Sequence, residues 1–347
     1  MFGLFGHPRP RSSRRGPLAP VAAALALCGA SVTLIAGGAP VAGAVARYTL
    51  VTEPANGLGP IYDLITSARH TLEMTMYELR DATAEADLVR AAERGVRVEV
   101  VLDQNLAKSY NLPAYTYLRS HGVMVHWAPK TYDVTHQKTI TVDGDVSAIM
   151  TLNLTSEYYA TSRDFAVIDR DTSDVDAIKT VFDGDFSGAP SSPEPVGSDL
   201  IWSPGADARL VGVIGSAQRT LYVENEVLSE YTIVDAVAAA ARRGVDVEVV
   251  MTYQSAWRSN LDKLAAAGVH VRTYSPDASL YIHAKVVVVD AGYPDQQLEM
   301  GSQNFSWGSL QYNRELGLDL GPAQAEVVDS VAATVRSDFA GAKPWTG

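Results

Sequence analysis

Cysteine and basic residues are scarce in this chain of 347 residues. Cys28 is the only cysteine, so the chain cannot form an internal disulfide. The 28 lysines and arginines are outnumbered by 40 aspartates and glutamates, which gives a formal net charge of −12. This charge disfavours broad coating of a polyanion such as DNA, although a local basic cleft could still bind one.

Composition and length indicate a folded protein of about two domains. Hydrophobic residues make up 47% of the sequence and charged residues 20%, values that are typical of a globular protein. This composition excludes an intrinsically disordered chain and a protein with many membrane spans. A length of 347 residues is too great for one small domain and suits two of ordinary size.

The first 44 residues have the features of an export signal. They contain four arginines before an apolar run at 18–35 and no acidic residue, and small residues at 42–44 offer a cleavage site. We therefore expect residues 1–44 to be a signal peptide and the protein to be secreted. Cys28 lies in the apolar run, so the mature protein would have no thiol for catalysis. An uncleaved anchor is the alternative, since the run is nearly long enough to span a bilayer.

The two halves of the sequence repeat each other. Residues 91–101, which read as a helix end, a turn glycine and a buried strand, recur 149 positions later as 240–250. Further on, residues 121–125 are matched by 267–271. Strands alternate with helices in each half, a pattern that predicts a parallel sheet covered on both faces. The expected fold class is therefore α/β, a duplicated unit with two mainly parallel sheets flanked by helices.

A segment between the halves has the composition of a linker. Residues 188–198 are rich in glycine, proline and serine, residue types that favour turns and loops. We therefore expect two domains, at 45–187 and 199–347, joined by this segment.

One sequence pattern, H-x-K-x(4)-D, occurs in each half. The copies consist of His136, Lys138 and Asp143 in the first half and His283, Lys285 and Asp290 in the second. Side chains two positions apart on a strand share a face, so each histidine should project beside its lysine. A lone strand histidine is more often a packed core residue than a catalyst. Repetition at equivalent places of a duplicated unit argues against that interpretation here.

The similarity of the halves continues beyond this pattern. The second half has Gly301-Ser302-Gln303-Asn304 followed by Glu315, and the first has Met150-Thr151-Leu152-Asn153 followed by Asp164. The interval from asparagine to acid is 11 residues in both halves. With its two H-x-K-x(4)-D copies, the sequence resembles the phospholipase D superfamily from about residue 47 to the end. Met150 and Thr151 depart from the glycine and serine of that family, but threonine keeps the hydroxyl group.

The residue types suit cleavage of a phosphodiester. One imidazole can attack phosphorus and form a phosphohistidine, and a second can donate a proton to the leaving alkoxide. Lysines and asparagine–hydroxyl pairs can bind the nonbridging oxygens and stabilise charge. The expected phosphate-binding pairs are Thr151 with Asn153 and Ser302 with Asn304. Because no cluster with metal-ligand spacing is present in the sequence, we expect a metal-independent enzyme without a cofactor.

The resemblance implies roles for the remaining polar residues. Asp164 and Glu315 would each hold a histidine ring through its Nδ1 proton. His136 would be the nucleophile and His283 the general acid and base. The acids expected to organise turns rather than to touch the substrate are Asp143 and Asp290.

Aromatic residues near both motifs leave the substrate open. They could line a lipid channel, contact a choline head group, stack on bases or simply pack in the core. Two acids, Glu78 and Glu226, end equivalent strands and either face the site or cap the next helix. The aromatic residues are Tyr132, Tyr158, Tyr159, Trp257, Tyr281, Trp307 and Tyr312.

Three functions fit the sequence. The leading one is a secreted phospholipase D that hydrolyses phospholipid to phosphatidate and head group at a membrane or micelle surface, and that also transfers the phosphatidyl group to alcohols. The second is a secreted, metal-independent nuclease or phosphodiesterase of the same superfamily, with nucleic acid as its partner. The third is a binding protein that kept the fold without catalysis. The halves should pack about a pseudo-twofold axis with one shared cleft, so we expect a monomer.

Overall fold

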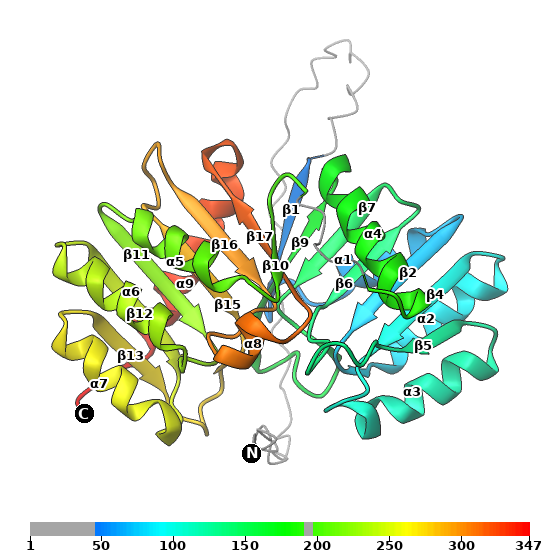
Figure 1. The fold of residues 1–347 in the computed structure, drawn as a ribbon, viewed down its shortest axis with the longest axis horizontal. Helices are drawn as coiled ribbons and strands as arrows, with labels where there is room; N and C mark the ends of the chain where they lie inside the picture. The colour runs from blue at the N-terminus through cyan, green and yellow to red at the C-terminus, as the bar shows by residue number, and fades with distance from the viewer. Residues whose placement is uncertain (1–45, 191–196) are drawn as a thin grey trace, which may run out of the picture. The chain divides into compact units, whose positions relative to one another are not determined.

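The computed structural model describes residues 46–190, the first half, and residues 197–347, the second half (Figure 1). Residues 47–347 form one compact unit. The expected signal peptide, 1–44, and the central part of the expected linker, 191–196, lie outside the described residues.

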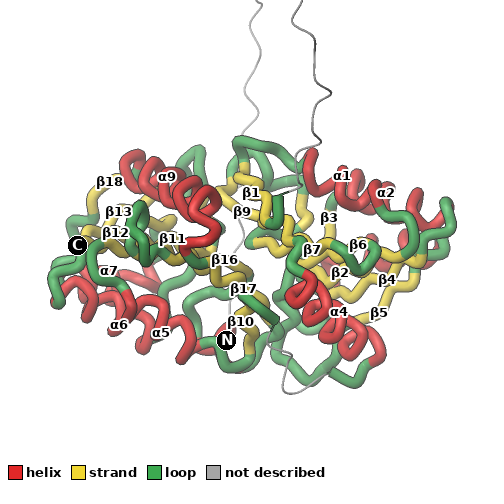
Figure 2. The backbone as a smooth tube through the Cα atoms, turned by 90° about the horizontal axis from the view of Figure 1, so that it is seen from above, coloured by secondary structure: helices red, strands yellow, loops and turns green. Residues whose placement is uncertain are grey.

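The first half is built on one sheet with helices on both faces. In sheet order, its strands are β1 (Tyr48–Glu53), β9 (Ser162–Asp169), β7 (Val146–Met150), β6 (Thr139–Val142), β2 (Thr71–Met76), β4 (Arg97–Leu102) and β5 (Met124–Trp127). Its helices are α1 (Gly59–Ser67), α2 (Ala82–Glu93), α3 (Lys108–Ser120) and α4 (Thr172–Ser187). Two short strands, β3 (Leu79–Arg80) and β8 (Leu154–Thr155), pair with each other. Figure 2 shows α1 and α2 on one face of the sheet and α4 on the other.

The second half has the same construction. Its strands in sheet order are β10 (Leu200–Ser203), β17 (Glu315–Leu320), β16 (Gln297–Gly301), β15 (Lys285–Val289), β11 (Thr220–Asn225), β12 (Asp246–Thr252), β13 (His270–Tyr274) and β18 (Lys343–Pro344). Its helices are α5 (Asp207–Ser216), α6 (Tyr231–Arg242), α7 (Arg258–Ala266), α8 (Trp307–Gln311) and α9 (Ala325–Gly341), with short 3₁₀ turns at Ser255–Trp257 and Pro322–Gln324. In Figure 2, α5, α6 and α7 lie on one face of the sheet and α9 on the other.

The equivalent strand order of the two sheets confirms the duplication and the α/β class. The expectation of mainly parallel sheets is wrong in its detail, because the pairing is mixed. β2, β4 and β5 are parallel neighbours, as are β11, β12 and β13, and helices connect the strands within each group. β6 and β7 are antiparallel, since the three residues between them, 143–145, cannot make the crossover that a parallel pair needs.

The aspartate of each motif holds the turn that follows its strand. Asp143 and Asp290 have positive φ angles of 55° and 48°, a conformation that aspartate tolerates better than most residues. Oδ1 of Asp143 accepts hydrogen bonds from the backbone N–H groups of His70 at 2.7 Å and Thr71 at 2.9 Å. Asp290 accepts the N–H of Thr220 in the same way at 2.8 Å. Each aspartate therefore ties the end of its motif strand to the start of the neighbouring strand.

A shared apolar core joins the two halves. Phe165 and Val167 on β9 belong to the same buried cluster as Leu316 and Leu318 on β17. Ile178 on α4 extends this cluster into the helical layer. The halves are therefore packed through a continuous core that runs between the strands carrying the two acids of the family pattern.

Two arginines cross between the halves at equivalent positions, each one residue before an acid of the family pattern. Arg314, which is fully buried, forms a two-pronged ion pair with Asp185 of α4, with N–O distances of 2.9 and 3.1 Å. Arg163 pairs with Asp338 of α9 in the same way, with Nη2 to Oδ1 at 3.0 Å. These reciprocal pairs fix the orientation of one half against the other.

Candidate active site

His136 and the acid that holds it come from different halves of the chain. Nδ1 of His136 lies 2.8 Å from Oε2 of Glu315 on β17. The backbone N–H of His136 donates to the carbonyl of Arg314 at 2.9 Å, and Thr135 forms a bridge with the same residue. This backbone pairing sets the ring beside Glu315. A carboxylate at Nδ1 keeps the ring proton there and leaves Nε2 to react.

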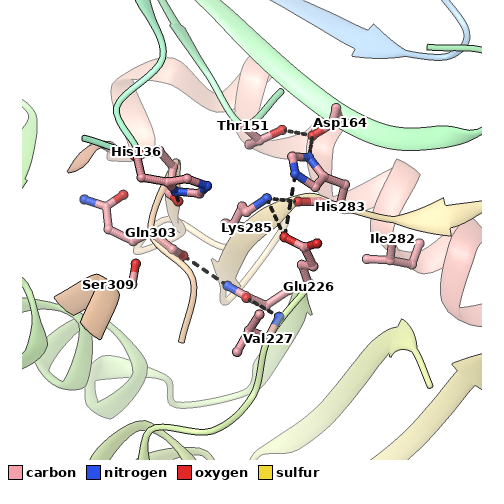
Figure 3. A network of polar contacts seen from close by, with 12 residues as sticks. His136, Thr151, Asp164, Glu226, Val227, Ile282, His283, Lys285, Gln303 and Ser309 are labelled. Carbon is pink, nitrogen blue, oxygen red and sulfur yellow. Dashed lines mark hydrogen bonds and ion pairs between the residues drawn. The ribbon is translucent and has the colours of Figure 1, made fainter. Parts of the chain in front are cut away.

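His283 is held by the first half in the same way. The short strand β14 (Tyr281–Ile282) pairs with Ser162 and Arg163 of β9, and the N–H of His283 donates to the carbonyl of Arg163 at 3.2 Å. Nδ1 of His283 lies 2.7 Å from Oδ1 of Asp164 (Figure 3). Each half therefore supplies the acid for the histidine of the other.

The motif lysines are buried beside their histidines. Nζ of Lys138 donates to the backbone carbonyl of His136, and Nζ of Lys285 donates to that of His283. Burial lowers the pKa of Lys138 to about 7 against the opposing effect of Glu315, and Lys285 across the site contributes to the decrease. The interaction of the two lysines places both motifs at one site.

His136 has the protonation state that a nucleophile requires. Burial lowers the pKa of His136 below its ordinary value, with Lys138 acting in the same direction and Glu315 opposing it. Burial alone would raise the pKa of Glu315, but His136 and Lys138 bring it below its ordinary value. At neutral pH the pair is therefore a neutral imidazole on a charged carboxylate, with the Nε2 lone pair available.

The hydroxyl groups expected at the phosphate have other partners. Oγ1 of Thr151 donates to Oδ1 of Asp164 at 2.6 Å and accepts the N–H of Phe165 at 2.9 Å (Figure 3). Oγ of Ser302 accepts the N–H of Leu316 at 3.1 Å. Both hydroxyls therefore brace the strands that carry the acids, and their role in phosphate binding stays a prediction.

Asn153 and Asn304 keep the features of phosphate-binding residues. Oδ1 of each is buried and has no hydrogen-bond partner among the described residues. Leaving a buried amide unpaired is costly, so such a group usually meets a ligand or an ordered water. The NH₂ groups of the two side chains can donate to the nonbridging oxygens of a phosphodiester.

One pair of equivalent positions breaks the symmetry of the site. Tyr77 and Glu226 are 149 residues apart in the sequence and each directly follows its strand, β2 or β11. Tyr77 packs edge-on against His136, with ring centroids 4.7 Å apart. Oε2 of Glu226 lies 3.6 Å from Nε2 of His283 and 3.2 Å from Nζ of Lys285 (Figure 3). The second histidine therefore has a carboxylate where the first has a phenol ring.

The sequence suggests a different counterpart for Glu226. Glu78, one residue beyond the true equivalent, lies 3.1 Å from Arg80 instead. Tyr77 is missed by motif reasoning, although the 149-residue interval of the repeat is a signal that identifies it. The same interval relates Asn111 of α3, which accepts the N–H of Leu79, to Asn260 of the equivalent helix α7.

Other residues that no motif indicates support the acids. Oγ of Ser309 donates to Oε1 of Glu315 at 2.6 Å, and Asn313 donates to the same oxygen at 3.1 Å. The hydroxyl of Tyr281 donates to Oε1 of Glu226 at 3.0 Å. These hydrogen bonds fix the carboxylates that in turn orient the histidines.

The aromatic residues near the motifs separate into buried and exposed groups. Tyr132 is 7% exposed, and the hydroxyl of Tyr159 donates to Asp81 at 2.7 Å. Trp307 and Tyr312, on α8 and just after it, are 55% and 48% exposed. Packing therefore accounts for the first group and leaves the second to contact solvent or a ligand.

Residues 46–190 and 197–347 contain neither a metal-binding cluster nor a membrane-spanning helix. No group of three or more histidine, cysteine, aspartate or glutamate side chains in this part of the chain is arranged to hold a metal ion. No helix within these residues is long and apolar enough to cross a bilayer.

The chemistry that these side chains share is nucleophilic attack on phosphorus with proton transfer to the leaving oxygen, so the site is that of a phosphodiester-acting enzyme. The family described as cardiolipin synthase, PLD-like domain, matches residues 61–186 and 210–338, one segment in each half. The chain belongs to this family and thereby to the phospholipase D superfamily.

Curated relatives have lipid-synthase names. The cardiolipin synthase of Listeria welshimeri serovar 6b is 24% identical over 273 residues, which cover 66% of this chain and 55% of the relative. The cardiolipin synthase of Listeria monocytogenes serotype 4a matches with the same identity and coverage. The chain thus spans about half the length of the curated relatives it matches.

Solved structures share the fold. A phosphatidylserine synthase from Haemophilus influenzae Rd KW20 superposes with a TM-score of 0.65 at 16% identity, over 86% of this chain and 87% of that one. A polyphosphate kinase from Porphyromonas gingivalis gives a TM-score of 0.63 at 14% identity, over 84% of this chain and 50% of that one. Identities this low show the fold alone.

Proposed function

We propose that this protein is a phospholipase D-type enzyme that transfers the phosphatidyl group of a phospholipid to water or to an alcohol. The observation that carries the proposal is the crossed pair of anchored histidines. His136 is held by Glu315 at 2.8 Å and His283 by Asp164 at 2.7 Å, each across the boundary between the halves. Two such imidazoles in one site supply a nucleophile and an acid for a double displacement.

The reaction then runs in two balanced steps. In the first, Nε2 of His136 forms a bond to phosphorus, the bond from phosphorus to the head-group oxygen breaks, and His283 gives its Nε2 proton to that oxygen. In the second, water or an alcohol gives a proton to His283 while its oxygen bonds to phosphorus and the N–P bond breaks. Lys138 and Lys285 stabilise the charge of the nonbridging oxygens in both steps.

Exposed apolar side chains beside the first motif support a lipid substrate. Trp307, Tyr312 and Leu106 are 55%, 48% and 49% exposed. The carbonyl of Tyr312 accepts the N–H of Asp133 at 3.1 Å, and Asn105, next to Leu106, donates to the carbonyl of Asp133 at 3.1 Å. Trp307 packs edge-on against Tyr312, with ring centroids 6.1 Å apart. The three apolar side chains thus border the loop that leads into the first motif, and we call them the apolar rim. Such a rim suits a membrane surface better than a polyanion.

The acceptor, the location and the oligomeric state of the protein complete the proposal. The curated relatives are named cardiolipin synthases, and this favours an alcohol as acceptor beside water. We also propose that the protein is secreted, on the basis of residues 1–44, and that it acts as a monomer, since one chain supplies both histidines.

Formation of phosphatidylethanol from phosphatidylcholine vesicles, with ethanol and a chelator present, tests the proposal. We expect product from the wild type and none from His136→Ala or His283→Ala, with unchanged circular dichroism in both variants. Wild-type protein that cleaves a simple aryl phosphodiester but makes no phosphatidylethanol would overturn the lipid assignment. Nucleic acid would then become the favoured substrate class.

A further inference from the structure

Glu226 is the asymmetric charge of a site that is otherwise nearly symmetric. Its counterpart in the first half is Tyr77, and burial raises the pKa of that phenol, so it stays neutral. Oε2 of Glu226 lies 3.6 Å from Nε2 of His283. No carboxylate of the described residues lies within ion-pair distance of Nε2 of His136. The two histidines therefore differ at the nitrogen that reacts.

Charged groups on several elements face His283. Asp164 on β9 lies 2.7 Å from Nδ1, and Glu226 after β11 faces Nε2. Lys285 on β15 opposes a positive ring, but Glu226 also pairs with that lysine at 3.2 Å and offsets its charge. Lys138 from the first half interacts with the same carboxylates from across the site. Of these groups, Glu226 is the carboxylate that faces the reacting nitrogen of His283.

The summed charge of the site also favours a proton on one of the two histidines. Asp164, Glu226 and Glu315 are three carboxylates, whereas Lys138 and Lys285 supply at most two positive charges, because the pKa of Lys138 is about 7. With both histidines neutral, an anionic phosphodiester would enter a site with an excess of negative charge. A proton on one histidine removes that excess and is needed by the leaving group.

We propose that Glu226 is a positioning residue that makes His283 the general acid and so assigns the departing head group to the second half of the site. The inference rests on the proposed function and adds to it the residue that decides the order of the two histidines. Tyr77, in the equivalent place, leaves Nε2 of His136 without a proton and able to attack. Two histidines that the sequence motif makes equivalent thus acquire different tasks because one neighbour differs.

The pH dependence of the first step tests this role with two substrates. Phosphatidylcholine has an alkoxide leaving group that needs a proton, whereas p-nitrophenyl phosphocholine releases a phenolate that needs none. The measurements are kcat/KM against pH for the first substrate and the burst of p-nitrophenol for the second. The variants are Glu226→Gln, Glu226→Asp and, as a matched control in the first half, Glu78→Gln, which alters a carboxylate paired with Arg80.

Glu226→Gln removes a negative charge 3.6 Å from Nε2 of His283, and this disfavours a proton on that nitrogen. We expect the alkaline limb of Glu226→Gln to move down by about one pH unit on phosphatidylcholine, with a roughly tenfold loss of rate on that limb. The p-nitrophenol burst should be little changed. Glu226→Asp should restore part of the limb, and Glu78→Gln should match the wild type.

An equal loss at every pH and on both substrates would overturn the inference, because a merely structural role predicts that result. An alkaline limb of Glu226→Gln that stays in place would overturn it as well. Wild-type protein that fails on both substrates would count against the proposed function instead.

Discussion

Glu315 lies 2.8 Å from Nδ1 of His136, although 179 residues separate them and they belong to different halves of the chain. Asp164 and His283, separated by 119 residues, mirror this contact. Neither half can orient its own histidine, so a competent site exists only when the halves are packed together. The contacts between the halves are therefore part of the catalytic apparatus.

Each acid holds the histidine of the other half, so replacing Glu315 and replacing Asp164 should impair different steps of the reaction. Glu315→Gln should abolish the burst of p-nitrophenol from p-nitrophenyl phosphocholine, because it releases the nucleophile His136. Asp164→Asn should keep the burst and slow the steady state, because His283 acts as the base of the second step. Each change should lower kcat by roughly 10²- to 10⁴-fold. Stopped-flow absorbance measures both phases, and the opposite pattern would assign the nucleophile to His283.

The duplication and the paired motif can be predicted from the sequence alone, because both appear in it as short local patterns. The H-x-K-x(4)-D spacing identifies His136 and Lys138 without reference to the rest of the chain, and the 149-residue interval relates the halves. The expectation that a strand carries both residues is wrong, because β6 begins at Thr139, and backbone pairing of Thr135 and His136 with Arg314 positions the motif instead. The mixed pairing of the sheets depends on the short turn at Asp143, which alternation of strands and helices does not reveal.

The parts of the site that the sequence does not predict depend on how the halves pack. Which acid serves which histidine is decided by backbone pairing of β14 with β9 and of Thr135 with Arg314. The hydroxyl of Thr151 reaches Asp164 because Thr151 directly follows β7, which pairs with the strand β9 that carries Asp164. Contacts of this kind leave no periodic signal in the chain.

The buried arginine pair between the halves predicts a large loss of stability. Arg314 and Asp185 are 0% and 1% exposed, so Arg314→Met removes the positive charge that pairs with a buried carboxylate. We expect a decrease of about 3–5 kcal/mol in the free energy of unfolding, measured by chemical denaturation. Arg258→Ala is the control, since its pair with Asp262 is about half exposed and should contribute less than about 0.5 kcal/mol.

A second change distinguishes the ion pair from simple packing. If loss of the opposite charge causes the decrease, the double variant Arg314→Met with Asp185→Leu should recover most of the lost stability, because neither charge of the buried pair remains. Equal instability of the single and double variants would show that the arginine stabilises the protein through its contacts with Tyr132 instead.

The pKa of Lys138 predicts that anions bind less tightly as the pH rises. Burial lowers this pKa to about 7, so the unliganded site loses a positive charge as the pH rises through that value. A bound anion favours the charged lysine, and its affinity should fall by up to tenfold per unit above about pH 7. Competitive inhibition by sulfate, which keeps its charge over this range, measures the effect. Lys138→Arg stays charged and should flatten the dependence; an unchanged slope in this variant would assign the effect to the histidines.

The apolar rim predicts a defect that appears only at a lipid surface. Trp307→Ala should lower activity on phosphatidylcholine vesicles about tenfold, because burial of one aromatic side chain contributes on the order of 1.5–3 kcal/mol to binding. Activity on a short-chain phosphatidylcholine below its micelle concentration should change less than about twofold, since the ring touches no reacting group. Tyr293→Ala is a suitable control. Tyr293 is 42% exposed but follows the far end of β15 from Lys285, so its loss should affect neither assay. Equal losses on vesicles and on monomeric lipid would place Trp307 in the substrate site rather than at the membrane.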